Sequence, residues 1–428
     1  MRDQLAALPL AGDPRGGIEQ MDELERLKSA VCAAQARLAH DLDQHRRAQA
    51  EARRLLDPQR RRPNPDAGVG TEIALARRES PHQGRLKLRL ARALLTDLPH
   101  TMAALERGDL NERRAEIIAA ETSDLTRDQR RGVDATVAPL VDGLGDADLR
   151  DVVRREVLRR DEEDWLARQA RARARRRVSG RVLGDGMGQL TAVLPATDVS
   201  AIMTALDATA DKARTAGDDR TRAQVVADVL VQRLGGPSAT APTPVALKVV
   251  LGAGTLLGCN DDPGYVAGAG YVPASVARRL VAAGAEHLRS TVQRLFAMPG
   301  SGALLATETT SSHFRNGLAD IIDLRDRRCR TPYCNARIRH RDHVTARAAG
   351  GSTTLANAQG LCKACNYAKE SPGWRHEPVP DPLAVTDIVV TTPTGQVHHS
   401  RAPDQPHAAE SVSPAERRVA ELLLRRAG

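Results

Sequence analysis

Four cysteines in the C-terminal third of the chain have the spacing of a metal site. They form two close pairs, Cys329 with Cys334 and Cys362 with Cys365, whereas the other two cysteines are isolated. Thiolates presented in pairs on short turns can complete the tetrahedron that a structural zinc ion requires. Buried free thiols are the alternative interpretation. The spacing predicts a structural Zn²⁺ that supplies much of the folding free energy of this segment, which is too short to build a large core.

The segment between and just after the cysteine pairs contains side chains suited to phosphodiester hydrolysis. Asp342 and His343 are adjacent, a Gly350-Gly351 turn follows, and Asn357 and Asn366 come later. An imidazole can take a proton from water near neutral pH, and carboxylate and amide oxygens suit Mg²⁺ or Mn²⁺. Each residue alone also has an ordinary interpretation, as a surface histidine beside an acid, a turn residue or a helix start. Only their joint spacing indicates a catalytic site.

From about Arg325 to His376 this order of residues resembles the HNH, or ββα-metal, nuclease superfamily. The resemblance implies that His343 is the general base and that Asp342 and Asn366 bind the catalytic ion. It also implies that the amide of Asn357 braces the loop that holds His343. The last signature position is asparagine instead of histidine, as in the junction-resolving phage nucleases of the superfamily. Its hard amide oxygen favours Mg²⁺ or Mn²⁺ over zinc for catalysis.

The charge distribution indicates a polyanionic partner, which we expect to be DNA. The net charge is +9, and residues 325–376 alone contain eleven basic and three acidic residues. Aromatic residues make up only 2% of the chain, which argues against binding of single strands by stacked bases. The arginines of this segment would grip the phosphate backbone, among them Arg325 and Arg330. The contacts that we single out are Arg339, Arg341, Arg347 and Lys369, although a solvated lysine is an equal alternative for the last.

Hydrophobic periodicity predicts a mainly α protein with minor β structure. A hairpin is expected where residues 178–183 and 189–194 alternate around Gly184-Asp185-Gly186, and a strand is expected at 245–251. Because aromatic residues are few, the core must rest on Leu, Val, Ile and Ala. The expected helices are 21–56, 84–98, 111–122, 126–140, 146–177, 199–215, 221–234, 274–283 and 414–426.

The whole chain resembles the actinobacterial family that joins a long helical domain of unknown function to a C-terminal HNH module, including the mycobacterial thirteen-E-twelve repeat proteins. The helical run from about Leu24 to Ser312 carries this resemblance, with Gly270-Tyr271-Val272-Pro273, the segment Ile338 to His343, and Glu370 to Trp374. The expected organisation is a flexible N-terminus (1–20), a helical domain (21–177), a mixed helix and strand continuation (178–312), a zinc-stapled HNH module (313–376) and a weakly ordered tail with a short helix (377–428).

Two hypotheses for the function remain. The first is a metal-dependent endonuclease that hydrolyses DNA phosphodiester bonds. The second is a zinc-containing DNA-binding protein of a mobile element that has lost catalysis. No apolar run is long enough to span a membrane and no Gly-Lys-Ser/Thr phosphate loop occurs, so we expect a cytoplasmic protein without a nucleotide cofactor. The sequence leaves the oligomeric state open.

Overall fold

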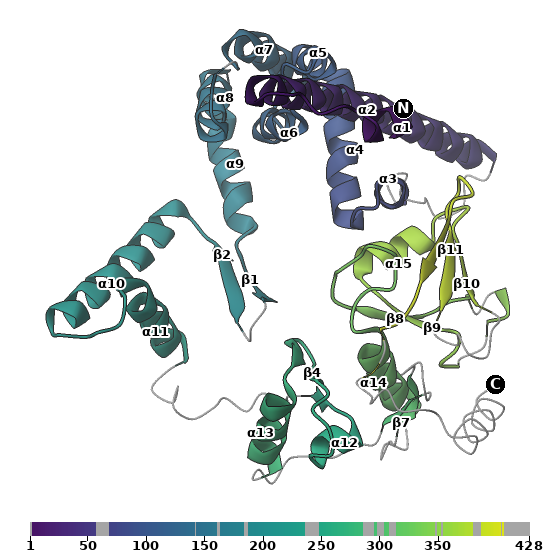
Figure 1. Cartoon of the computed structure of the whole chain (residues 1–428). Coiled ribbons are helices and arrows are strands. Elements are labelled where there is room, and N and C mark those ends of the chain that lie inside the picture. Colours follow the sequence, from purple (N-terminus) through teal and green to yellow (C-terminus); the bar gives the residue numbers. More distant parts are fainter. Residues whose placement is uncertain are drawn as a thin grey trace. The chain divides into compact units, whose positions relative to one another are not determined.

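The structure, a computed structural model, divides into two compact units (Figure 1). The first contains the described residues of Met1–Trp165 and Arg294–Asp404, and the second contains those of Leu166–Gln293. The N-terminal helices and the C-terminal module therefore share one unit, which the order of the expected domains along the chain does not predict. The structure describes residues 2–56, 68–141, 143–160, 163–183, 187–235, 248–285, 295–297, 304–307, 314–346, 349–351, 354–379, 387–403 and 405.

The N-terminal part of the first unit is helical, as expected. The helix expected from residue 21 begins at Pro14, a residue that suits the first helical turn. The prediction of a flexible N-terminus is therefore wrong for residues 14–20. The helix expected over 146–177 is described as α8 and α9, and strand β1 begins at Arg177. The helices are α1 Arg2–Ala6, α2 Pro14–Leu56, α3 Val69–Arg77, α4 Pro81–Thr96, α5 Pro99–Arg107, α6 Glu112–Glu121, α7 Arg127–Val137, the 3-10 helix η1 Ala138–Leu140 and α8 Asp146–Arg160. The next helix, α9 Glu163–Ala174, belongs to the second unit from Leu166 onwards.

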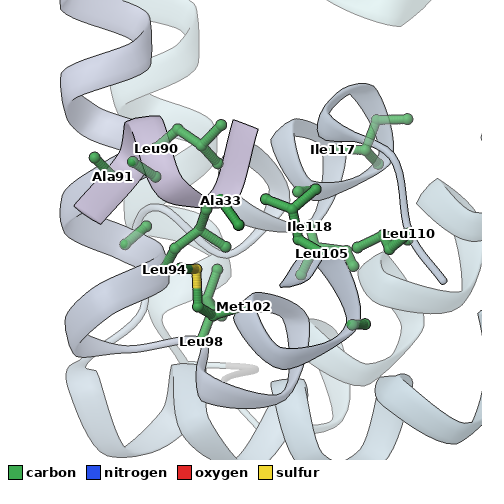
Figure 2. Packing of buried hydrophobic residues seen from close by; sticks show 14 of the residues in the cluster. Ala33, Leu90, Ala91, Leu94, Leu98, Met102, Leu105, Leu110, Ile117 and Ile118 are labelled. Carbon is green, nitrogen blue, oxygen red and sulfur yellow. The ribbon is translucent and has the colours of Figure 1, made fainter. Parts of the chain in front are cut away.

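An aliphatic core holds helices α2 to α8 together (Figure 2). Helix α2 contributes a face of small residues, including Ala33, against which the leucines of α4 and α5 pack. Polar side chains fix the helix ends. Asn111 accepts a hydrogen bond from the amide of Arg114 at the start of α6, and the buried carboxylate of Asp134 accepts from the amide of Thr101 at the start of α5. The core thus rests on Leu, Val, Ile and Ala, as the composition predicts, with Met102 in addition.

The second unit contains the expected hairpin and a small antiparallel sheet. Strands β1 and β2 pair in the register Arg177 with Val193, and two helices follow. The strand expected at 245–251 is described only as Val249–Val250, the edge of the sheet β3-β4-β5. The elements are β1 Arg177–Val182, β2 Gly188–Val193, α10 Ala196–Thr215, α11 Arg222–Gly235, β3 Val249–Val250, α12 Ala253–Leu256, β4 Gly264–Val266, β5 Gly270–Val272 and α13 Ala274–Ala285.

The C-terminal part of the first unit contains the ββα arrangement that the cysteine and histidine pattern predicts. Antiparallel strands β8 and β9 are followed directly by helix α15. A second sheet, of order β10-β11-β12, comes next. The elements are β6 Leu295–Ala297, β7 Leu304–Thr307, α14 Phe314–Asp326, β8 His340–His343, β9 Ala358–Leu361, α15 Lys363–Lys369, β10 Arg375–Pro378, β11 Ile388–Thr391 and β12 Val397–Ser400.

The prediction that the tail is weakly ordered is wrong for the residues of strands β11 and β12. Ile388 and Val390 are buried, so β11 contributes apolar side chains to a core although the surrounding sequence is rich in Pro, Thr and His. These residues alternate with the period of a strand, a signal that the composition of the segment obscures. The short helix expected at 414–426 lies outside the described residues.

Candidate active site and metal centre

The four paired cysteines converge on one point. Their Sγ atoms all lie within 4.8 Å of one another, and Sγ of Cys334 and Sγ of Cys365 are 3.8 Å apart. Zn–S bonds of about 2.3 Å in a tetrahedron place the sulfurs about 3.8 Å from one another. Within the described part of the chain, this is the one cluster of three or more His, Cys, Asp or Glu side chains that could hold a metal ion. The donor set and its spacing fit tetrahedral zinc.

Short turns and a helix start present the thiols. The amide of Cys334 donates to the carbonyl oxygen of Thr331 at 3.0 Å, and Tyr333 adopts a left-handed conformation with φ of 62° to complete this turn. Cys362 caps helix α15, because its Sγ accepts a hydrogen bond from the amide of Cys365. Hydrogen bonds among the four thiols lower the pKa values of Cys329 and Cys362 and raise those of Cys334 and Cys365, so the four groups titrate as one network.

Strand β8 carries Asp342 and His343 at its end, paired with β9. Asp342 lies opposite Gln359 and His343 opposite Ala358. The carbonyl oxygen of His343 accepts hydrogen bonds from Nε2 of Gln359 at 3.2 Å and from Nζ of Lys369 at 2.6 Å. The backbone of the proposed base is therefore fixed from both β9 and α15.

The side-chain amide of Asn357 holds the residue that follows Val344. Its Oδ1 accepts from the amide of Thr345 at 2.8 Å, and its Nδ2 donates to the carbonyl oxygen of Thr345 at 3.0 Å. Gly351 is required beside this pair, because a Cβ there would lie 1.9 Å from the same carbonyl oxygen and 2.8 Å from Nδ2 of Asn357. Asn357 therefore holds the backbone of Thr345 through both its amide and its carbonyl oxygen.

Asn366 and Lys369 lie three residues apart on α15 and so share one face of the helix. Oδ1 of Asn366 is buried and has no hydrogen-bond partner among the described residues. Nζ of Lys369 donates to Oδ2 of Asp342 at 2.6 Å, and the lysine side chain is only 7% exposed. An unpartnered buried amide oxygen is costly in a folded protein, and a hard cation is one partner that would satisfy it.

The residues that we expected to contact DNA have different surroundings. Arg339 and Arg341 are both exposed. The guanidinium of Arg341 is paired with Asp323 of α14, and this pairing raises the pKa of Arg341. The ammonium of Lys369 is turned inward to Asp342, so the direct phosphate contact expected of it is absent from this arrangement. Arg347 lies outside the described residues.

Two arginines counted as backbone contacts are instead buried in the module, which corrects that interpretation. Arg325 and Arg330 both form ion pairs with the fully buried Asp326. Arg325 also donates to the carbonyl oxygens of Leu355 and Ala358, and Arg330 donates to Ser400 of β12. Their close spacing around one aspartate is the only sequence signal of this network, and a count of charges conceals it.

The sequence did not indicate a role for Gln359 or for the side chain of His376, which ends the predicted module. Both are buried, and Nδ1 of His376 lies 3.1 Å from Oε1 of Gln359, whose amide in turn donates to the carbonyl oxygen of His343. Burial, assisted by the charge of Lys369, lowers the pKa of His376 to about 4. A neutral histidine therefore supports the strand that carries His343.

No helix within the described ranges has the length and apolar composition needed to cross a bilayer.

Neither the curated proteins nor the solved structures include a significant match to this chain. Two family models do match. The HNH endonuclease model covers residues 329–371, which include the four cysteines, Asp342, His343 and Asn366. The model described as a domain of unknown function, DUF222, covers residues 22–326, well over half of the chain. The chain therefore belongs to the DUF222 family and has an HNH endonuclease domain on the C-terminal side of its DUF222 region.

Proposed function

We propose that this protein is a metal-dependent endonuclease that hydrolyses phosphodiester bonds in DNA. In this proposal His343 is the general base, and Asp342 and Asn366 bind one Mg²⁺ or Mn²⁺ ion. The four cysteines bind a structural Zn²⁺.

The observation that carries the proposal is the buried Oδ1 of Asn366, which has no partner among the described residues. It lies on the helix whose Lys369 contacts Asp342, which supports the proposal that Asn366 and Asp342 bind the same ion. Asp342 already has a cation beside it, the ammonium of Lys369. Oxygen donors of these two kinds are the ligands that Mg²⁺ and Mn²⁺ prefer.

The chain's own groups account for positioning and proton transfer. The bound ion would polarise a phosphoryl oxygen and stabilise the leaving oxygen. His343 takes a proton from the attacking water at an imidazole nitrogen, and such help typically increases a rate ~10²–10⁴-fold. Gln359 and Lys369 hold the carbonyl oxygen of His343, and Asn357 holds Thr345, so the backbone that carries the imidazole is fixed on both sides of Val344.

Nicking of supercoiled plasmid DNA tests the proposal. The purified zinc-loaded protein is expected to nick plasmid in Mg²⁺ or Mn²⁺ and to be inactive in excess chelator. The variant His343→Ala is expected to abolish nicking while zinc content and circular dichroism stay unchanged. His399→Ala is the matched control, because His399 is an exposed histidine of strand β12 outside the site. Equal nicking by His343→Ala and by the wild type would contradict the assignment of the base.

Tight, salt-dependent DNA binding without cleavage in any divalent metal would favour the alternative, a non-catalytic DNA-binding protein. The assay should include supercoiled, linear, branched and modified DNA, so that one experiment tests both activity and substrate class. Asn366→Ala separates the two hypotheses further. It removes a proposed metal ligand, so it should abolish cleavage and weaken Mn²⁺ binding. If the protein only binds DNA, the same variant should leave the DNA affinity unchanged.

A further inference from the structure

Helix α3 is buried on all its sides. Seven consecutive residues of this short helix, Val69–Leu75, are buried. A helix that lies on the surface of a domain buries one stripe and exposes the other, so a helix covered all round must lie between two partners.

One partner is helix α4 of the same DUF222 region. A Cβ on Gly84 would lie 2.0 Å from the carbonyl oxygen of Gly70 and 2.8 Å from the amide nitrogen of Ala74. The two backbones are therefore so close that only glycine fits at residue 84. This contact fixes α3 to the helical core.

The other partner is the HNH module. Leu75, only 1% exposed, belongs to an apolar cluster with Val344 and Trp374 of the module and with Ile388 and Val390 of the following strand β11. At the opposite end of α3, Gly68 has φ of 96°, and a Cβ there would lie 2.7 Å from Nε1 of Trp374. Both ends of the helix thus contact the module.

A buried carboxylate reinforces this contact. Glu72, in the middle of α3, has a side chain that is only 4% exposed. It accepts two hydrogen bonds of 3.1 Å from Nη2 of Arg46 on α2 and one of 3.1 Å from the amide of Thr394, in the turn between β11 and β12. A buried charge is tolerated only when its hydrogen bonds are satisfied, and here the partners come from both sides of the helix.

We infer that α3 is a structural component of the nuclease module and that Leu75 is a positioning residue for His343. Val344 directly follows His343, and its amide donates to the carbonyl oxygen of Asn357 at 2.8 Å. Leu75 and Val344 belong to the same buried apolar cluster, and this cluster therefore limits how far the end of β8 can move. This assigns one role to the DUF222 region: it supplies the helix that supports the strand carrying the base.

Hydrogen exchange of the full-length, zinc-loaded protein tests this inference without any need for activity. In Leu75→Ala, amides in the peptide 340–346 are expected to exchange at least ~10-fold faster. The free energy lost with a buried leucine side chain is larger than the one that corresponds to a tenfold change in a local opening equilibrium. Leu105→Ala is the matched control, since Leu105 is equally buried, at 1%, but lies in the helical core. It should loosen α5 and leave 340–346 unchanged.

Unchanged exchange of 340–346 in Leu75→Ala, or equal acceleration by both variants, would overturn the inference. Glu72→Gln provides a second test that keeps side-chain volume. It should accelerate exchange at the amide of Thr394 and leave helix α6 unaffected. If both Leu75→Ala and Leu105→Ala unfold, this milder variant still decides whether α3 is a structural component of the C-terminal part of the chain.

A cleavage readout rests on the proposed function and tests positioning. In Leu75→Ala, kcat should fall roughly 10–100-fold with KM little changed, because small displacements of a reacting group are costly, and Leu75→Met should restore the rate. A parallel loss of kcat in Leu105→Ala would mean that general destabilisation is responsible. If the wild type cleaves no DNA, the proposed function fails, whereas the exchange experiment still tests the role of α3.

Discussion

Nζ of Lys369 lies 2.6 Å from Oδ2 of Asp342 and 2.6 Å from the carbonyl oxygen of His343. One ammonium therefore connects helix α15 to a proposed metal ligand and to the backbone of the proposed base. A metal ion bound at Asp342 would be close to this positive charge, and the two cations would compete for the same carboxylate.

Replacing Lys369 is expected to strengthen metal binding and weaken the metal-free fold. In Lys369→Met, the dissociation constant for Mn²⁺ should fall about tenfold, because an opposing charge is removed from the carboxylate. In excess chelator the same variant should unfold more easily by about 1–3 kcal/mol, since Asp342 and the His343 carbonyl oxygen lose a partner. Calorimetric Mn²⁺ titration measures the first effect. Lys363→Met, at an exposed position of the same helix, is the control. Weaker Mn²⁺ binding would mean that Lys369 organises the site instead of competing for it.

Loss of the zinc ligands is expected to unfold the module selectively. Cys365→Ser should reduce the bound zinc from one equivalent to none and accelerate exchange in β9 and α15, because metal binding contributes about 10–16 kcal/mol in small zinc folds. Far-ultraviolet circular dichroism should change little, since the aliphatic core of α2 to α8 does not depend on the ion. Cys259→Ser, at an exposed cysteine of the second unit, should leave the zinc content intact. Retention of zinc in Cys365→Ser would exclude this ligand set.

The cysteines and the ββα order of the module could be predicted from the sequence, because metal ligation imposes fixed residue types at fixed spacing. Helix α3 could not, because its short apolar run follows a basic, proline-bearing segment and its burial depends on two partners far apart in the chain. Lys369 and Arg330 were misassigned for one reason. A count of charges does not show whether a cation faces solvent or a buried carboxylate, and Asp342 and Asp326 decide that only once the chain has folded.

The buried network around Asp326 predicts unequal effects of its members. Asp326→Ala should destabilise the module by about 3–5 kcal/mol, because it removes the carboxylate that balances two buried guanidiniums and accepts from the amide of Gly360. Arg330→Ala should cost less, since Arg325 still pairs with the aspartate. Urea unfolding followed by the fluorescence of Trp374, with Trp165 replaced by Phe, reports on the module and on its contact with α3. Equal effects of the two variants would contradict the central role of Asp326.

The depressed pKa of His376 predicts that acid destabilises the module. The pKa is about 4 in the folded protein and 6.5 in the unfolded chain, so between these values the unfolded state binds more protons and stability falls as the pH falls. The loss from this residue should approach about 3 kcal/mol near pH 4. His376→Gln should flatten this part of the pH profile measured by urea unfolding. If the unfolding free energy of His376→Gln falls with pH as steeply as that of the wild type, protonation of His376 does not cause the loss of stability.

The different surroundings of Arg339 and Arg341 predict different contributions to DNA binding. Both are exposed, but Asp323 pairs with Arg341 and offsets its charge. Arg339→Ala should lower the slope of log affinity against log salt concentration by up to ~0.9, as expected for one lost phosphate contact, and Arg341→Ala should lower it less. Asp323→Asn should increase affinity, because it frees the guanidinium of Arg341 for a phosphate. Fluorescence anisotropy with labelled duplex DNA at several salt concentrations measures all three slopes. If Arg341→Ala lowers the salt slope as much as Arg339→Ala does, the ion pair between Arg341 and Asp323 opens when DNA binds. In that case Asp323→Asn should raise the DNA affinity without changing the salt slope.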